Sequence, residues 1–472
     1  MGQLCKRNVK NFSIKNRAMK TLFITSFHPH ISRNILLTPV LEMLKEKKDL
    51  RIVIVTADYK VDYFEKTFGD ENVFVEGVKL YRASRTKRGL FFKRLGLFLL
   101  NTPTTLVHKK YQYYCKKKYV YYVCARFVGL VGRSLLVRCI VRKLDLLFSP
   151  KDLFKDIYDK YNPNIVFSTD IQNENDVSLM QDARRRKVNI VGMLRSWDNT
   201  TMRIMRIFPD KLLVGSRLLF NEMIEFYNYP TNKMVIVGNP HIEKLKNPTM
   251  SKEDLYNYFG LNPELPLIFF APSDDHLARR KDINKYMLEL LSEVNANILV
   301  RFPPTDTATI GDFKKPENMF YDKPGVSFGE KICTDREIGL EDNDRLTNEI
   351  NYSDIIISGP TSIPMDAVFL DKPSIMAEIY PTPCSFCDCI YNFKTAHIVR
   401  MLAIGGVTHV ESEEKLFSLI DDFLKNPNLF KAERAKTRSI YFSHTDGNSS
   451  NRITEEILNF IYDQDDTSKH SK

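Results

Sequence analysis

Two small hydroxyl side chains follow an apolar run in the second half of the chain and are placed to bind an anion. The run 354–358 predicts a buried strand, and Gly359 is expected to turn the chain after it. Thr361 and Ser362 then stand where a helix begins, and the free backbone N–H groups of a helix start bind phosphate. Asp366 lies one turn further along, where a carboxylate can accept hydrogen bonds from a ribose. The segment predicts a nucleotide diphosphate site, with plain N-capping as the alternative.

Two more loops with polar tips follow apolar runs in the same half. One follows the run 267–271 and carries Asp274 and His276; the other begins at Arg301, which ends the run 297–301. Ligands of open parallel sheets bind beyond the carboxyl ends of the strands, so these loops can converge on one ligand. Each loop taken alone also fits a solvated connection. The residues predicted to bind the donor are Ser273, Asp274, His276, Arg301, Ser358, Gly359, Thr361, Ser362 and Asp366.

The first half offers a general base and a second binding surface. His28 and His30 follow the apolar run 21–25, and histidine has the pKa of a base that works near neutral pH. A surface histidine beside Pro29 is the alternative. The residues after the apolar run 189–194 are predicted to line an acceptor pocket; they are Arg195, Trp197, Asp198 and Asn199. As an alternative, Asp198 could cap a helix.

These residues need strands that end at one edge of a sheet, and the hydrophobic pattern supplies two such series. Solid apolar runs predict buried parallel strands, in the first half at 21–25, 51–56, 164–168, 189–194, 211–215 and 234–238, and in the second at 267–271, 297–301, 354–358 and 373–376. Helical spacing separates them, so we expect an α/β protein of two Rossmann-like doubly wound domains that face a cleft. The expected parts are a flexible extension (1–18), an acceptor domain (19–248), a nucleotide-donor domain (249–445), and a C-terminal helix and tail (446–472).

Several functions lose their main sequence support. The chain has no GxGxxG, GxxxxGK[ST], HExxH or GxSxG pattern, which argues against dinucleotide oxidoreductases, P-loop enzymes, zinc peptidases and serine hydrolases. Eight cysteines in 472 residues are too sparse for a disulfide framework, and a reducing interior is expected. The one cluster, Cys384, Cys387 and Cys389, lacks a partner pair, so a structural or incidental role is expected rather than a metal site. No metal or cofactor is predicted.

Positive charge is concentrated in one segment. Residues 79–146 hold seventeen Lys or Arg and a single acid, a net charge of +16, whereas the whole chain carries +11 and the rest therefore −5. Phe, Tyr and Leu are interleaved with these cations, a composition that suits the headgroup region of an anionic membrane. A solvated helical insert is the first alternative. Nucleic-acid binding is the second, and no motif of such proteins supports it.

Taken together, these segments resemble glycosyltransferases of the GT-B fold. They are most similar to the branch of CDP-glycerol glycerophosphotransferase-like and UDP-N-acetylglucosamine 2-epimerase-like proteins that builds bacterial surface polymers. The resemblance is carried by the segments 196–200, 209–214, 237–240, 353–366 and 446–453. It implies a nucleotide-activated donor in the C-terminal half and an acceptor in the N-terminal half. In that family Arg301 would begin an R-x-H-P segment, but Pro303 replaces the histidine here, which favours a sugar donor over glycerophosphate.

We therefore expect a metal-independent glycosyltransferase that moves a sugar from a nucleotide diphosphate to a surface-polymer or lipid-linked acceptor. It is expected in the cytoplasm, bound peripherally to the inner face of the membrane through residues 79–146, without a nucleic-acid partner. The alternatives are a transferase of polyol phosphate from a CDP-linked donor and a non-catalytic basic scaffold that binds membranes.

Overall fold

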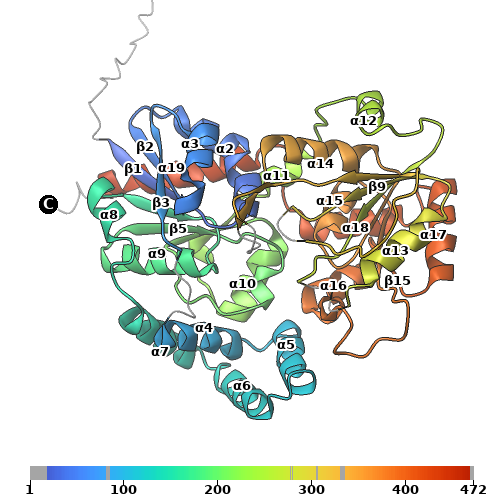
Figure 1. The fold of residues 1–472 in the computed structure, drawn as a ribbon. Coiled ribbons are helices and arrows are strands. Elements are labelled where there is room, and N and C mark those ends of the chain that lie inside the picture. Colours follow the sequence, from blue (N-terminus) through green and yellow to red (C-terminus); the bar gives the residue numbers. More distant parts are fainter. Residues whose placement is uncertain are drawn as a thin grey trace, which may run out of the picture.

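The computed structural model describes residues 19–80, 86–276, 278, 280–304, 307–329 and 335–467, with side chains up to residue 462. The predicted extension 1–18 lies outside the described residues. Two α/β domains lie next to each other, and a group of helices formed by the basic segment lies below the first domain in this view (Figure 1).

The first domain is built on a seven-stranded sheet of order β3-β2-β1-β4-β5-β6-β7. Its strands are parallel throughout; in β1, for example, Phe23 lies opposite Val53 of β2 and Val166 of β4. Buried residues pack on both faces, which explains the solid apolar runs. The bounds are β1 Lys20–Ser26, β2 Leu50–Ala57, β3 Val73–Val78, β4 Ile165–Ser168, β5 Asn189–Met193, β6 Lys211–Val214 and β7 Met234–Ile236.

The second domain repeats this plan with six strands in the order β10-β9-β8-β13-β14-β15. The strand order reverses between β1 and β4 in the first domain and between β8 and β13 in the second, and such switch points are where α/β sheets bind ligands. The predicted fold of two Rossmann-like domains is therefore confirmed. The bounds are β8 Leu267–Ala271, β9 Asn297–Arg301, β10 Met319–Asp322, β13 Ile355–Ser358, β14 Ser374–Ala377 and β15 Thr408–Val410, and a small antiparallel pair is formed by β11 Val326–Ser327 and β12 Arg336–Glu337.

Helices cover both faces of each sheet (Figure 1). In the first domain they include α2 Pro39–Lys45, α3 Val61–Phe68, α8 Lys155–Tyr161, α9 Glu174–Arg185 and α10 Arg217–Tyr227, and α11 Pro240–Lys244 leads into the second domain. The second domain contributes α12 Lys252–Phe259, α13 Ile283–Ser292, α14 Leu340–Tyr352, α15 Ile363–Phe369, α16 Ala396–Ile404, α17 Glu413–Lys425 and α18 Lys431–Tyr441.

The last helix, α19 Ser449–Thr467, returns to the first domain. Ile453, Ile457 and Ile461 recur at helical spacing and are buried in the same core as Leu22 and Ile24 of β1. The two domains are thus joined by two crossings of the chain.

The basic insert folds into four helices, α4 Lys87–Leu99, α5 Pro103–Tyr114, α6 Tyr119–Val131 and α7 Leu135–Phe148. Helix α5 lies against both domains: the Thr104 hydroxyl donates to Thr201 Oγ1 (3.1 Å) and accepts from the backbone N–H of Ala396 (3.0 Å). Among the described residues, no helix combines the length and apolar character needed to cross a membrane.

One cysteine expectation is wrong. Cys115, at the end of α5, forms a disulfide with Cys387 of the second domain. The sequence predicted a reducing interior without a disulfide framework. It could not reveal this single bond, because spacing along the chain does not indicate a contact between cysteines 272 residues apart. Cys387 is therefore not free to join Cys384 and Cys389 as a metal ligand.

Candidate active site

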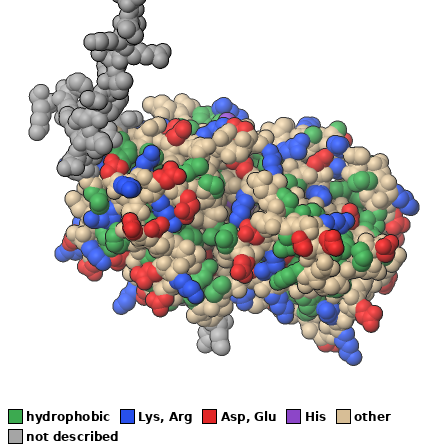
Figure 2. All heavy atoms as spheres, turned by 90° about the horizontal axis from the view of Figure 1, so that it is seen from above, with side chains coloured by type: hydrophobic (Ala, Val, Ile, Leu, Met, Phe, Trp, Pro, Cys, Tyr) green, Lys and Arg blue, Asp and Glu red, His purple; other side chains and the backbone are tan. Residues whose placement is uncertain are grey.

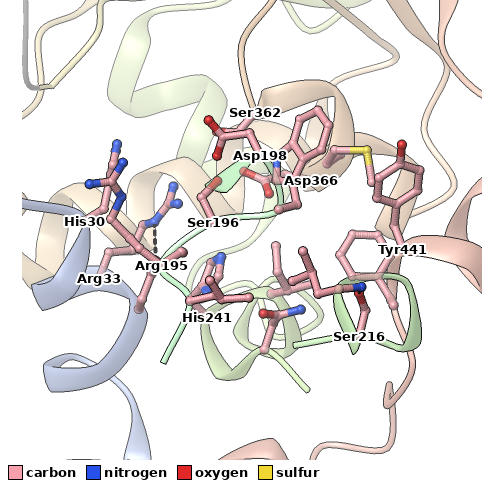
Figure 3. A pocket seen from close by; sticks show the side chains of 18 residues that line it. His30, Arg33, Arg195, Ser196, Asp198, Ser216, His241, Ser362, Asp366 and Tyr441 are labelled. Atoms are coloured by element: carbon pink, nitrogen blue, oxygen red, sulfur yellow. Dashed lines mark hydrogen bonds between the residues drawn. The ribbon is translucent and has the colours of Figure 1, made fainter. Parts of the chain in front are cut away.

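A cavity of about 220 Å³ lies between the two domains. The first domain contributes His30 and Arg33 from the loop after β1, and Arg195 from the loop after β5. The second domain contributes Ser362 and Asp366 from the start of α15, on the opposite wall (Figure 3). We call this space the interdomain cavity.

A second cavity, also of about 220 Å³, adjoins the first on the side of the second domain. Its walls come from the loops after β8, β9 and β13, and include Asp274, Thr361 and the apolar side chains of Phe302 and Leu346. We call it the donor-domain cavity. His30, Arg33 and Ser362 line both cavities, so a single ligand can span the two.

The loop after β1 has a local structure that directs side chains into these cavities. Pro29 begins the short helix α1 Pro29–Ile31, and the His28 ring caps it by accepting from the His30 N–H (3.2 Å). A π-helical turn, η1 Ser32–Leu36, follows directly. Such turns are frequent at functional sites because they re-aim side chains. The His28 side chain caps the helix and lines neither cavity, whereas His30 and Arg33 line both.

The histidines are held neutral. Burial lowers the pKa of His30 well below its ordinary value, and the charges of Arg33 and Arg195 add to the effect. The pKa of His28 is lowered in the same way, and so is that of His241, which lines the interdomain cavity. A neutral imidazole can accept a proton, which is the state that a general base requires.

Three polar atoms around the donor-domain cavity are buried and have no hydrogen-bond partner among the described protein atoms: His30 Nδ1, Thr361 Oγ1 and Asn343 Nδ2. A buried polar atom without a partner costs about 1–3 kcal/mol. Three of them around one space favour a polar ligand that satisfies them.

Asp366, in the first turn of α15, lines the neighbouring interdomain cavity together with His30 and Arg33. Burial raises the pKa of its carboxyl to about 6, and the nearby Arg33 opposes the rise. The carboxylate is ionised at neutral pH and can accept hydrogen bonds from ligand hydroxyls.

Arg301 is not the free cation that the sequence suggested. Its guanidinium is buried and donates to Asp322 (2.5 Å), Glu349 (2.7 Å) and the Asp342 carbonyl (2.7 Å). These acceptors come from β10 and α14, elements whose proximity the sequence did not reveal. Arg301 still lines the donor-domain cavity, but its charge is compensated by these carboxylates, whereas Arg33 lines both cavities.

The five remaining predicted donor residues occupy three kinds of position. Asp274 lines the donor-domain cavity, whereas His276 is exposed and lines neither cavity. Ser273, Ser358 and Gly359 are buried and shape the loops behind the cavity. The Ser358 hydroxyl donates to the Gly359 carbonyl (2.8 Å). A Cβ at Gly359 would come within 2.1 Å of Ser273 Oγ, so a larger residue there would require the Ser273 side chain to move.

Three of the four predicted acceptor residues line the interdomain cavity: Arg195, Trp197 and Asp198. Arg195 is held by Asp170 (2.6 Å), and its Nε atom has no partner within the described chain. Asn199 is buried instead, where its side chain accepts from the Ser196 N–H (2.8 Å) and fixes the loop.

Sequence reasoning missed several polar residues that line the interdomain cavity, among them Arg33, His241 and Tyr441. His241 directly follows the segment 237–240, so that motif could have led to it. Tyr441 ends α18, far along the chain, and packs edge-on against Trp197 with ring centres 5.6 Å apart. No local sequence pattern indicates that Tyr441 lines the cavity.

A possible metal-ligand group lies elsewhere. Glu378, His409 and Glu411 bring one ligand atom each within 4.8 Å of the others, next to the ends of β14 and β15. None of the three lines either cavity.

Solved structures show the same fold at low sequence identity. UDP-GlcNAc 2-epimerase from Neisseria meningitidis bound to UDP-GlcNAc is 14% identical, with a TM-score of 0.55 over 93% of this chain and 100% of that one. The UDP complex of S. aureus MnaA is 12% identical, with a TM-score of 0.54 over 94% and 97%. A variant of the wall teichoic acid polymerase TagF is 11% identical, with a TM-score of 0.51 over 94% and 90%. No curated protein matches the sequence.

The sequence model of one family matches residues 192–459, more than half of the chain. This stretch includes the loop after β5 and the start of α15, which line the cavities, and the first part of the return helix α19. With its GT-B architecture, the chain belongs to the CDP-glycerol:poly(glycerophosphate) glycerophosphotransferase family.

Proposed function

We propose that this protein is a transferase that moves a sugar from a nucleotide diphosphate donor to a hydroxyl of a surface-polymer or lipid-linked acceptor. One observation carries the proposal: two adjoining cavities share His30 and Arg33, and the Thr361 hydroxyl at the helix start of the donor side has no partner among the described atoms. A cation, a neutral base and a free hydroxyl at one junction suit the transfer of a group from a phosphate.

Each group has a role in this proposal. The nucleotide occupies the donor-domain cavity, with its base against the apolar wall. Its ribose lies toward the junction with the interdomain cavity, which Asp366 lines. The diphosphate lies at Thr361 and Ser362, next to Arg33. His30 removes the proton of the acceptor hydroxyl, which lies in the interdomain cavity beside Trp197. Donors that bind the developing charge of a leaving group are worth about 3–4 kcal/mol each in measured enzymes.

A second candidate is transfer of a polyol phosphate from a CDP-linked donor, which the family match favours. Pro303, where the family pattern has histidine, favours the sugar donor instead, because proline offers no acid or base. Incubation with UDP-sugars and with CDP-glycerol distinguishes the two, because the nucleotide released differs: UDP from the first and CMP from the second.

Nucleotide binding can be measured directly, because the chain has one tryptophan and it lines the interdomain cavity. Titration with nucleoside diphosphates is expected to change Trp197 fluorescence. Thr361→Val should weaken the binding, and Ser358→Ala, whose hydroxyl contacts only the loop behind the cavity, should not. Failure of every nucleoside diphosphate to bind would contradict the proposal and favour a non-catalytic scaffold.

We also propose that the protein works peripherally at the inner face of the membrane, where a lipid-linked acceptor would be presented. The support is the charge of the insert 79–146, +16 in a chain whose other residues sum to −5.

A further inference from the structure

Four of the eight cysteines meet where the basic insert touches the second domain. Cys115, at the end of α5, is bonded to Cys387 of the loop after β14, with 5.3 Å between their Cα atoms. Cys384 and Cys389 belong to the same loop, and their thiols interact directly. The sequence argued against a metal site because this cluster lacks a partner pair. The fold supplies the missing sulfur, because it brings Cys115 to the cluster from the other domain.

The loop folds into a tight turn around its cysteines. The Ser385 carbonyl accepts from the backbone N–H groups of Asp388 and Cys389 (3.0 Å each), and the Ser385 hydroxyl accepts from the N–H of Cys387 (3.3 Å). This turn keeps Cys384 close to the two cysteines that follow it. The spacing C-x₂-C, which Cys384 and Cys387 have, is typical of a ligand pair in structural zinc sites.

The approach of Cys115 to this loop does not depend on the disulfide. Tyr114 packs edge-on against Phe386, with ring centres 6.1 Å apart, so the residue before Cys115 contacts the loop as well. One turn earlier in α5, the ring of Tyr111 lies 5.6 Å from that of Tyr391. These contacts hold α5 against the loop when the disulfide is reduced, and the sulfurs then remain neighbours.

We propose that, in the reduced protein, Cys115, Cys384, Cys387 and Cys389 bind a Zn²⁺ ion as four thiolates. A dithiol reductant gives two electrons and two protons to the Cys115–Cys387 bond, which becomes two thiols, and the reductant is itself oxidised to a disulfide. Zn²⁺ then displaces the four thiol protons. Four sulfur ligands in a tetrahedral arrangement are typical of structural zinc. The bonded state, in which Cys387 is not free, is the oxidised form of the same site.

The surroundings compensate the charge of such a site. Four thiolates and Zn²⁺ carry a net negative charge, and a cation lies on each side of the cluster. Lys116 directly follows Cys115 in the basic insert. On the other side, the Arg280 guanidinium interacts with the sulfur of Cys384 and is also paired with Asp282.

The zinc ion is structural in this proposal, because none of the four cysteines lines either cavity. Helix α5 belongs to the insert of the first domain and the loop to the second domain. The ion therefore joins the two domains in a reducing interior, as the disulfide joins them in the oxidised form. The inference goes beyond the proposed transfer and does not depend on it.

The group of Glu378, His409 and Glu411 fits a metal less well. Acidic and basic side chains are interleaved over the surface, as the view from above shows (Figure 2), and exposed acidic groups are common without a metal. Cysteine is rare by comparison, so four of eight at one loop are a more specific signal. Thiolate is also the softer ligand, and soft ligands select zinc.

The test is metal binding by the full chain without an affinity tag. The protein is reduced with dithiothreitol, freed of it without air, and titrated with Co²⁺ and then with Zn²⁺. We expect the charge-transfer absorption of thiolate-bound Co²⁺, which Zn²⁺ abolishes, at about one ion per chain. Cys115→Ser and Cys384→Ser should each weaken zinc binding by at least about tenfold, since even the loss of an outer-shell partner costs about 10–100-fold. The matched control is Cys124→Ser, an exposed free cysteine on α6, which should bind as the wild type does.

A second measurement needs no variant. Zinc should protect the four cysteines of the reduced wild type from alkylation by iodoacetamide, whereas Cys124 should react with or without the metal. Mass spectrometry of the digested chain reads both results, and circular dichroism shows that the variants are folded.

Three results would overturn the proposal. The first is a Cys115–Cys387 bond that dithiothreitol does not open in the folded chain. The second is a reduced wild type that binds Co²⁺ no more tightly than Cys115→Ser does, with no protection of the four cysteines. The third is a metal that is lost in His409→Gln and retained in Cys115→Ser, which would assign it to the group of Glu378, His409 and Glu411.

Discussion

Lys60 of the first domain and Glu337 of the second form a buried ion pair, with Lys60 Nζ 2.7 Å from Glu337 Oε1. The two side chains are 2% and 0% exposed. The other carboxylate oxygen of Glu337 accepts from the Ser32 hydroxyl (2.8 Å), one residue before Arg33. The pair therefore joins the domains and also fixes the turn that carries the cationic group of both cavities.

Glu337→Gln should lower the free energy of unfolding by about 3–5 kcal/mol, because it leaves the Lys60 ammonium buried without its counter-charge. Urea denaturation measures this. The control is Asp70→Asn, which removes an exposed partner 3.5 Å from Lys45 and should leave the free energy of unfolding nearly unchanged. Equal stability of the two variants would show that the interdomain pair contributes nothing specific.

His30→Gln should lower kcat by about 10²–10⁴-fold with little change in nucleotide affinity, as expected when a general base is lost. Burial keeps the pKa of His30 well below its ordinary value, so the wild-type rate should be level near neutral pH and fall only in more acidic solution. His276→Gln is the control, since that ring is exposed and lines neither cavity. A rate that is unaltered in His30→Gln would exclude this histidine as the base.

Asp366→Asn should raise the KM for the donor and remove its dependence on pH near 6. The carboxyl has a pKa of about 6 in the folded protein, so the wild type should bind the donor less well as the pH falls through that value. The raised pKa also means that ionisation destabilises the folded state as the pH rises from about 4 to above 6. The variant should therefore be somewhat more stable than the wild type at pH 7. A less stable variant would indicate a structural role instead.

Arg33→Met should weaken nucleotide binding, whereas Arg301→Met should lower the stability of the fold. Arg33 lines both cavities, so its loss should weaken nucleotide binding and leave the unfolding free energy nearly unchanged. Arg301→Met removes the partner of two buried carboxylates, Asp322 and Glu349, and should cost about 3–5 kcal/mol. Thermal unfolding and the Trp197 titration, run on both variants, check the assignment; the reverse outcome would restore Arg301 as the phosphate ligand.

The strands that run through the middle of each sheet were predictable from their residues. Segments such as 52–55 and 355–357 are apolar throughout because helices cover both faces of the sheet. The edge strands β3, β10 and β15 were missed, because partly exposed edge positions break the apolar run.

The loops after β5, β8, β9 and β13, which line the two cavities, could be predicted from the strands before them, but the contacts within these loops could not. The position of Thr361 can be predicted from the strand before it and the helix after it. Arg33 depends on a π-helical turn, and the position of Arg301 depends on acids that follow it by 21 and 48 residues. Contacts of this kind are decided by tertiary packing, which local sequence does not encode.

The return of α19 to the first domain has a consequence during synthesis on the ribosome. Leu22, Ile24 and their neighbours have no cover from Ile453, Ile457 and Ile461 until the final helix has left the exit tunnel. The apolar surface of the first domain that α19 covers therefore stays exposed, and accessible to chaperones, until the second domain has been translated.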